Sequence, residues 1–529
     1  MNSSATDKLQ TLYRIFYCKQ CNFIYARLFY IMEAISMKKF RFCLHVLSVL
    51  IIFAGCKAGS SAAQEFNADF FKRKIEGEIT ISAYDTMSYK SYLEEAARAF
   101  EQLYPGTKIN IETFSAMPEI RSGTDGNMTM TSVQIQNDPQ SRSDYLSRVN
   151  TNIMSGTGAD IFAMDIIPLH KFTESGTLEN LEPYMNLDPE FNKSAYRHNI
   201  LDALKYSGGI WFIPMDYNFN YFVYDSTLIP SDIASGFGAD RSFKSSDLLS
   251  IGIPLYSGNY KLFNTTDFER GLGGMFNQLF SENYRNFINL ETGRANFTDG
   301  GFASLLSSVR NYAEQGYIPR AVTGQQDAGR VMRQAMDAPR DRFYFKLNNN
   351  FSLASHYMRA TGRRVMMSFG GSVMGIDDDD LVAGIQARAD GKVPFSYNAG
   401  FAVNSKSKNK ETAWVFIKFL LSKEMQLSTN LRATGLPVNN EARAEKSEMT
   451  FSGSLYGMAD ALNEQGRQAL RDYITEMERL SALINVFDLR DTNISDMVAQ
   501  DVQFFIDGSR VAEEVARILQ NKADLYLSE

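Results

Sequence analysis

Apolar residues beyond residue 75 follow first an alternating and then a helical pattern. Residues 79–83 alternate as in a half-buried strand, and residues 89–104 place apolar side chains at helical spacing. A Pro-Gly pair ends this helix, and residues 109–111 alternate again. The pattern predicts a β-α-β unit, which is typical of a parallel sheet covered by helices.

A second unit of the same kind follows along the chain. Residues 145–154 have the spacing of a helix, and residues 160–164, which are apolar after Asp160, are typical of a strand. Ligands of parallel sheets bind beyond the carboxyl ends of the strands. Three polar residues stand at such ends and are candidate ligand contacts: Asp85, Thr86 and Asp165.

The segment from Trp211 to Tyr224 is rich in aromatic residues. As a strand after Pro214, it places aromatic rings on one face and Asp216 with two asparagines on the other. A sugar offers hydroxyl groups at its edge and C–H groups on its faces, so a sugar site needs carboxylates or amides together with aromatic rings. We therefore expect Trp211, Asp216 and Tyr217 to contact a ligand.

Composition and charge exclude several classes of protein. The chain has 529 residues, of which 44% are hydrophobic and 22% charged, and its net charge is -7. No run of Lys or Arg gathers in the body of the chain, so a nucleic-acid partner is not expected. Residues 377–380 are acidic but lack the spacing and the glycine of an EF-hand loop, and the histidines stand singly. We expect neither a metal nor a cofactor.

The N-terminal region holds all four cysteines and a targeting signal. From Met37 the sequence has a basic start, an apolar stretch over residues 42–53 and a small pair before Cys56. Such a short stretch is typical of a secretory signal and not of a permanent membrane helix. Its last four residues resemble a bacterial lipobox, which implies removal of residues 37–55 and a lipid on Cys56. Residues 56–74 then hold the lipidated cysteine and a flexible tether.

Residues 1–36 do not fit a signal peptide, because charged residues interrupt their apolar positions. A ribosome-binding sequence can be encoded just before the codon of Met37, so we interpret residues 1–36 as an upstream extension that is not translated. Cys18 and Cys21 have the spacing of half a zinc site, but no second pair of ligands follows downstream, so they do not predict a zinc site.

Five segments, in order, resemble the extracellular solute-binding proteins of ABC importers, the large family that includes maltose-binding protein. The clearest is YLSRVNTNIMSGTGADIFAMD over residues 145–165. The others are ITISAYDT with AARAFEQLYPGTKINIE, GGIWFIPMDYNFNYFVYDSTLIP, AGFAVNSKSKNKETAWVFIKFLLSKEMQ, and the terminal helix over residues 511–527. Together they frame nearly all of the chain after Cys56.

The resemblance implies an α/β protein with a two-lobed, periplasmic-binding-protein-like (type II) fold and a ligand cleft between the lobes. Lobe one would hold residues 75–207 and 395–440, and lobe two residues 208–394 and 441–529. A solute would close the lobes by hinge bending. The protein would be a monomer without catalytic residues, anchored by its lipid on the outer face of the cell membrane, and would deliver the solute to ABC permease subunits.

The resemblance also implies further ligand contacts. Gly371 and Ser372 stand where the family has a small-residue loop near the solute, and Tyr397 and Asn398 precede the return crossing between the lobes. Whether Glu478 and Arg490 reach the cleft from the late helices stays open.

The solute we expect is a carbohydrate, and an oligosaccharide in particular, while a peptide or a polyamine stays open. A surface glycan-cleaving enzyme is the alternative from another class. It needs two carboxylates about 5–9.5 Å apart, for which Asp165 and Asp216 are the candidate pair. A sensory lipoprotein that presents its closed form to a receptor is a third possibility.

Overall fold

The computed structural model describes residue 71 and residues 74–85, 89–115, 139–264, 272–319, 342–349, 380–428, 430–431, 435–451 and 464–528. The chain divides into two compact units, Met1–Phe66 and Asn67–Glu529, and all described residues lie in the second. Among them, no helix is both long and apolar enough to span a membrane. Four predicted sites fall outside the described residues: Cys56, Thr86, Gly371 and Ser372.

The first of two five-stranded sheets has the strand order β2-β1-β3-β14-β4. Strand β1 pairs in parallel with both β2 and β3, while β14 is antiparallel to β3 and β4. The alternation in β1 buries Ile79, Ile81 and Ala83 completely, which confirms the predicted β-α-β unit. The strands are β1 (Gly77–Asp85), β2 (Thr107–Ser115), β3 (Ile161–Ala163), β4 (Ile213–Pro214) and β14 (Gly400–Val403). Helices α4 (Tyr89–Leu103), α5 (Pro139–Ser155) and α15 (Lys410–Leu420) pack on this sheet.

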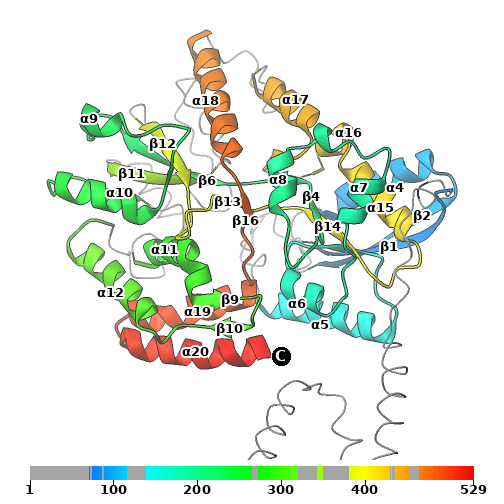
Figure 1. Cartoon of the computed structure of the whole chain (residues 1–529), viewed down its shortest axis with the longest axis horizontal. Helices are drawn as coiled ribbons and strands as arrows, with labels where there is room; N and C mark the ends of the chain where they lie inside the picture. Colours follow the sequence, from blue (N-terminus) through cyan, green and yellow to red (C-terminus); the bar gives the residue numbers. More distant parts are fainter. Residues whose placement is uncertain are drawn as a thin grey trace, which may run out of the picture. The chain divides into compact units, whose positions relative to one another are not determined.

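The second sheet has the order β7-β12-β6-β11-β8, with β6 antiparallel to both of its neighbours. Its strands are β6 (Asn220–Asp225), β7 (Ser242–Phe243), β8 (Lys261–Asn264), β11 (Phe343–Asn349) and β12 (Asp380–Gln386). The helices on this side are α10 (Ser245–Gly252), α11 (Leu272–Phe287), α12 (Gly301–Glu314), α19 (Thr492–Ile506) and α20 (Ala512–Ser528). Figure 1 shows the two sheets on opposite sides of this unit, with short strands between them.

The first sheet with its helices and the second sheet with its helices form two groups of elements. Further helices among the described residues are α6 (Leu169–Glu174), α7 (Glu182–Leu187), α8 (His198–Ala203), α9 (Ser231–Ala234), α16 (Lys423–Gln426), α17 (Asn440–Phe451) and α18 (Glu464–Ala482). Three two-stranded pairs are β5 (Asp216–Tyr217) with β15 (Leu436–Pro437), β13 (Pro394–Phe395) with β16 (Val486–Phe487), and β9 (Ile288–Asn289) with β10 (Arg294–Ala295).

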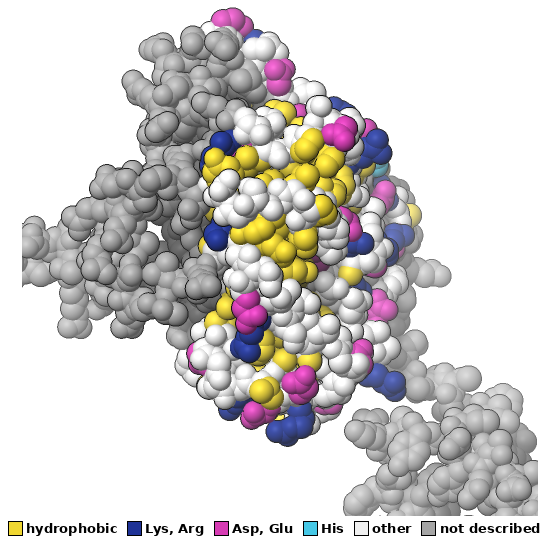
Figure 2. Space-filling view, turned by 90° about the vertical axis from the view of Figure 1, so that its left-hand side faces the viewer, with side chains coloured by type: hydrophobic (Ala, Val, Ile, Leu, Met, Phe, Trp, Pro, Cys, Tyr) yellow, Lys and Arg dark blue, Asp and Glu magenta, His cyan; other side chains and the backbone are white. Residues whose placement is uncertain are grey.

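One outer face of the second sheet and its helices has apolar side chains at its centre. Figure 2 looks onto this face and shows hydrophobic side chains gathered there, with charged side chains around them. Among the exposed large apolar residues is Ile253, which is 37% exposed in the short helix η6 (Ile253–Leu255).

Three segments of the chain cross between the two groups, and Asp216 joins them. The first crossing follows Pro214, because β4 still belongs to the first sheet while β6 belongs to the second. The Asp216 carboxylate accepts hydrogen bonds from the backbone N–H groups of Asn398 at 3.0 Å and Ala399 at 3.1 Å in the second crossing. It also accepts one from the N–H of Gly435 at 3.0 Å, next to β15 in the third. A single buried carboxylate therefore ties all three crossings together.

We predict that Asp216→Ala lowers the free energy of unfolding by at least about 3 kcal/mol, because it leaves several buried N–H groups without an acceptor. Urea denaturation measures the loss. Asp232→Ala, at an exposed position in α9, is the matched control and changes the free energy by less than about 1 kcal/mol. Equal effects of the two substitutions would contradict the role of Asp216.

Candidate functional site

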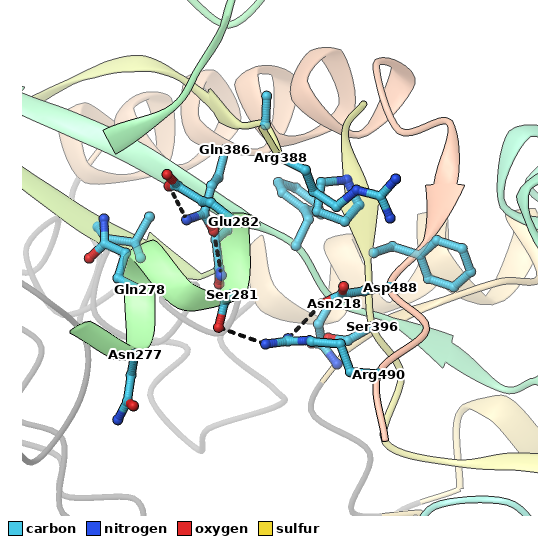
Figure 3. Close-up of a pocket in the computed structure, with 16 residues that line it drawn as sticks. Asn218, Asn277, Gln278, Ser281, Glu282, Gln386, Arg388, Ser396, Asp488 and Arg490 are labelled. Carbon is cyan, nitrogen blue, oxygen red and sulfur yellow. Dashed lines mark hydrogen bonds and ion pairs between the residues drawn. The ribbon is translucent and has the colours of Figure 1, made fainter. Parts of the chain in front are cut away.

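A pocket of about 340 Å³ lies beside the crossings, between the second sheet, helix α11 and the segment after β16. Figure 3 shows how its polar side chains converge from these elements. The lining residues are Asn218, Phe219, Asn220, Asn277, Gln278, Ser281, Glu282, Leu347, Gln386, Ala387, Arg388, Pro394, Phe395, Ser396, Asp488 and Arg490. Eleven of these sixteen are polar or charged, so the pocket suits a polar ligand.

The first crossing supplies two asparagines to the pocket. Asn218 forms an isolated antiparallel bridge with Ser396, with N···O distances of 2.7 and 2.9 Å, and this bridge fixes its backbone. Its side-chain Oδ1 is buried and has no hydrogen-bond partner. A buried acceptor without a donor is costly, and a ligand donor would remove that cost.

Arg490 stands at the pocket with its guanidinium held in place. It pairs with Asp488 at 2.5 Å and donates to the Ser281 hydroxyl at 2.7 Å. Arg388 is held in the same way by Asp390, at 2.5 Å. Each arginine thus has a carboxylate partner, so the arginines do not make the pocket a strong anion site.

A buried carboxylate, Glu282, lies in the pocket wall on α11 and is 6% exposed. It accepts hydrogen bonds from the Ser245 hydroxyl at 2.6 Å and from Gln386 Nε2 at 2.7 Å. Burial raises the pKa of Glu282 to about 7, although the hydrogen bonds from Ser245 and Gln386 oppose the shift. Glu282 therefore changes its charge near neutral pH.

Two of the predicted ligand residues have structural partners instead of pocket exposure. Asp216 is 2% exposed and binds the crossing backbones, and Tyr217 is fully buried in the strand pair with β15. Asn398 is exposed, and its Nδ2 donates to Asp216 Oδ2 at 2.6 Å. The structure therefore brings Asp216 and Asn398 together at the crossings, outside the pocket lining.

Four further predicted residues lie on the side of the first sheet. Trp211 is half-buried and donates from Nε1 to the Tyr206 carbonyl at 2.7 Å. Tyr397 donates to the Met164 carbonyl at 2.8 Å, which brings it next to the half-buried Asp165. Burial, followed by the charges of Asp165 and Asp216, raises the pKa of Tyr397. Asp85 ends β1, and its side chain is outside the described residues.

Of Glu478 and Arg490, which the sequence left open, one lines the pocket and the other lies near the crossings. Arg490 lines the pocket. Glu478 on α18 instead binds Arg197 at 3.1 Å and Arg443 at 2.7 Å, near the third crossing.

Side chains also link the two groups of elements away from the crossings. Arg142 on α5 pairs with Asp496 on α19, and Lys171 on α6 donates to the Tyr526 carbonyl of α20 at 3.0 Å. His170 on α6 has its Nε2 at 3.6 Å from Asp491 Oδ2. In Figure 1 these helices lie side by side below the crossings.

Within the described ranges, no three His, Cys, Asp or Glu side chains gather so as to hold a metal ion.

The pocket contains residues that the sequence did not single out. They are Asn277, Gln278, Ser281, Glu282, Gln386, Arg388 and Asp488. They belong to separate elements and form no local motif, so their common location is set by the fold. The alternation after Pro214 was the one usable signal, since it separates Asn218 and Asn220 from the buried aromatic residues between and beside them.

A family model of bacterial extracellular solute-binding proteins matches residues 124–452. The chain belongs to this family. No protein of curated function matches the sequence. Membership makes the chain an extracellular solute-binding protein and not an enzyme, which confirms the family expected from the sequence.

Solved structures with the same fold are similar to the chain at low identity. A family 1 extracellular solute-binding protein from Alicyclobacillus acidocaldarius is 16% identical, with 86% of this chain and 100% of that one covered and a TM-score of 0.51. A putative oligosaccharide periplasmic-binding protein from Synechococcus is 13% identical, with 85% and 99% covered and a TM-score of 0.51. The sugar-binding protein MalE from Xanthomonas citri is 14% identical, with 85% and 98% covered and a TM-score of 0.50. These likenesses confirm the two-lobed α/β fold.

The raised pKa of Glu282 predicts how this carboxyl affects stability. A carboxyl whose pKa is about 7 in the folded protein and 4.5 in the unfolded chain stabilises the fold fully below about pH 4.5. This contribution is lost as the pH rises to about 7 and amounts to about 3 kcal/mol. The free energy of unfolding of Glu282→Gln, relative to wild type, should therefore rise between pH 5 and pH 8.

Urea denaturation at several pH values measures this difference. Glu291→Gln, at an exposed turn position, is the control and should show no such trend. A Glu282→Gln difference that stays constant with pH would contradict the assignment.

Proposed function

We propose that the protein binds a neutral carbohydrate, an oligosaccharide in particular, in the pocket and in the adjoining space between the two lobes. The polar lining of the pocket carries this proposal. It combines amides, two hydroxyls and two carboxylates, the groups that pair with sugar hydroxyls in either direction.

The charges of the lining favour an uncharged solute. Arg490 is paired with Asp488 and Arg388 with Asp390, so both arginines already have carboxylate partners and neither favours an anionic solute. Tyr397, which is half-buried next to the crossing, supplies an apolar face for the C–H groups of a sugar. Two of the structures with a similar fold are named as sugar-binding or oligosaccharide-binding proteins, which agrees with this solute class.

The other wall of the site is proposed on the first sheet. Asp165 and Asp85 stand at strand ends that face the crossings, with Thr86, Gly371 and Ser372 as further contacts. A solute that touches both lobes favours their closed arrangement, because only that arrangement offers it both sets of contacts. The crossings around Asp216 are the hinge of this motion.

The cellular role follows from the N-terminal signal. The proposed mature chain begins at Cys56, carries a lipid there and remains on the outer face of the membrane as a monomer. Its closed form delivers the solute to the permease subunits of an ABC importer, which supply the energy of transport.

A panel of melting temperatures tests the solute class. A ligand at a hundred times its dissociation constant stabilises the protein by about 2.7 kcal/mol, which raises the melting temperature by a few degrees. We expect a rise with at least one of maltotriose, cellotriose, xylotriose and raffinose, and none with spermidine or tripeptides. The variant Asn218→Ala should reduce the rise, whereas Asn286→Ala, at an exposed position on α11, should retain it. A rise with spermidine or tripeptides alone would contradict the carbohydrate proposal.

The lipid anchor has a separate test. We expect wild-type protein to fractionate with membranes and Cys56→Ala to lose this association, because the thiol that carries the lipid is absent. Mass spectrometry of the membrane form should find a diacylglyceryl group on Cys56 as the first residue. A wild-type chain that retains residues 37–55 or has an unmodified Cys56 would contradict the anchor.

A further inference from the structure

The pocket wall contains a chain of hydrogen bonds centred on Glu282. Glu282 Oε1 accepts from the Ser245 hydroxyl at 2.6 Å on one side and from Gln386 Nε2 at 2.7 Å on the other. Glu282, Ser245 and Gln386 are all at most 6% exposed, so water does not replace these bonds. Ser245 and Gln386 both donate to the carboxylate, and this fixes the direction of the hydrogen bonds that each of them makes with its next neighbour.

The Gln386 branch ends at Asn220. Because its amide N–H₂ group faces Glu282, Gln386 presents its Oε1 to Asn220 and accepts from Nδ2 at 2.8 Å. Asn220 thus gives one of its two amide N–H groups to Gln386, and this bond fixes the orientation of its amide. Its carbonyl oxygen, an acceptor, lies on the other side of the amide and remains for the pocket, which Asn220 lines.

The Ser245 branch ends at Gln278. A serine hydroxyl has one proton, and Ser245 gives it to Glu282, so its oxygen accepts from Gln278 Nε2 at 2.5 Å. Gln278 Oε1 is consequently an acceptor, and it is buried without a hydrogen-bond partner. Asn218 Oδ1, on the crossing side of the pocket, is a second buried acceptor without a partner.

We propose that Glu282 is a positioning residue that sets the polarity of the pocket, so that its amides present acceptors and select solute groups that donate hydrogen bonds. This inference rests on the carbohydrate proposal and narrows it. Free sugar hydroxyls fit such a wall, whereas O-methylated hydroxyls accept but cannot donate and are rejected.

Protonation of Glu282 reverses the direction of the hydrogen bonds in one of the two branches. If the carboxyl donates to Gln386 Oε1, the Gln386 amide turns and donates to Asn220 Oδ1, which leaves the Asn220 N–H₂ group facing the pocket. If it donates instead to Ser245, the Ser245 proton goes to Gln278 Oε1. One proton thus turns one acceptor into a donor, with no other group ionised.

The surroundings of Glu282 allow this change near neutral pH. The charged groups on the neighbouring elements are Lys244 and Asp247 at the start of α10, Arg388 after β12, and Asp488 with Arg490 across the pocket. Asp247 adds to the effect of burial in raising the pKa of Glu282 to about 7. A solute that prefers the acceptor wall therefore binds more weakly in acid and releases a proton when it binds near pH 6.5.

Titration calorimetry tests the proposal with whichever of maltotriose, cellotriose, xylotriose and raffinose gives the largest melting shift. We expect about tenfold weaker binding at pH 5.5 than at pH 8, from the loss of one well-matched hydrogen bond. In two buffers of different ionisation enthalpy at pH 6.5, wild type should release a fraction of a proton. The fully O-methylated form of the same sugar should bind at least about tenfold more weakly at pH 8.

Three variants distinguish an effect on the hydrogen-bond relay from an effect on folding. The relay is the chain of hydrogen bonds from Glu282 through Ser245 and Gln386 to the pocket amides. Glu282→Gln should bind with no pH dependence and release no proton. Asn220→Ala, which leaves Glu282 in place, should weaken binding and flatten the pH profile, while Asn286→Ala on the outside of α11 should keep both wild-type values. Binding of the sugar with equal affinity at both pH values, or with proton uptake, would overturn the relay while leaving the carbohydrate proposal intact.

A measurement without ligand keeps the two proposals apart. The side-chain N–H₂ signals of Gln278 and Gln386, in protein labelled selectively at glutamine, should shift with one common midpoint near pH 7. In Glu282→Gln these shifts should be absent. A common titration in a protein that binds no sugar would support the relay and overturn the carbohydrate proposal, whereas signals that do not titrate would overturn the relay.

Discussion

The arrangement of the two lobes depends on one buried carboxylate. Asp216 lies in the first crossing and accepts backbone N–H groups from the other two, at Asn398, Ala399 and Gly435. The third crossing comes so close that a side chain at position 435 would overlap the carboxylate, so this position requires glycine. In the proposed closure, a shared anchor of this kind couples the three crossings, because displacing any one of them breaks hydrogen bonds to the same group.

The first crossing and the pocket wall are consecutive along the chain. Asp216 fixes the crossing, Asn218 is bridged to Ser396 in the return crossing, and Asn220 begins strand β6 in the pocket wall. A change in the angle between the lobes therefore changes the position of the pocket asparagines directly. On the far wall, Glu282 holds its neighbours by buried hydrogen bonds, which are strong because water is excluded from them.

The sequence predicted the local elements well and the site only in part. The alternation around residues 79–83 and the helical spacing after it appear in the structure as β1 and α4. The alternation after Pro214 separated buried aromatic rings from asparagines that line the pocket. The sequence predicts Asp216 as a ligand contact because a carboxylate beside aromatic residues is typical of a sugar site. In the structure its carboxylate accepts backbone N–H groups about 180 and 220 residues further along the chain, and no local pattern reveals these contacts.

Small-angle X-ray scattering of residues 67–529, with and without the sugar that gives the largest melting shift, tests the central claim most directly. If the lobes close around a carbohydrate on the hinge at Asp216, the radius of gyration falls when the sugar saturates the protein. In Asp216→Ala, provided that it is folded, the same sugar concentration should leave a larger fraction open. An unchanged radius of gyration in saturated wild-type protein would contradict closure and, with it, the account of Asp216 as the centre of a hinge.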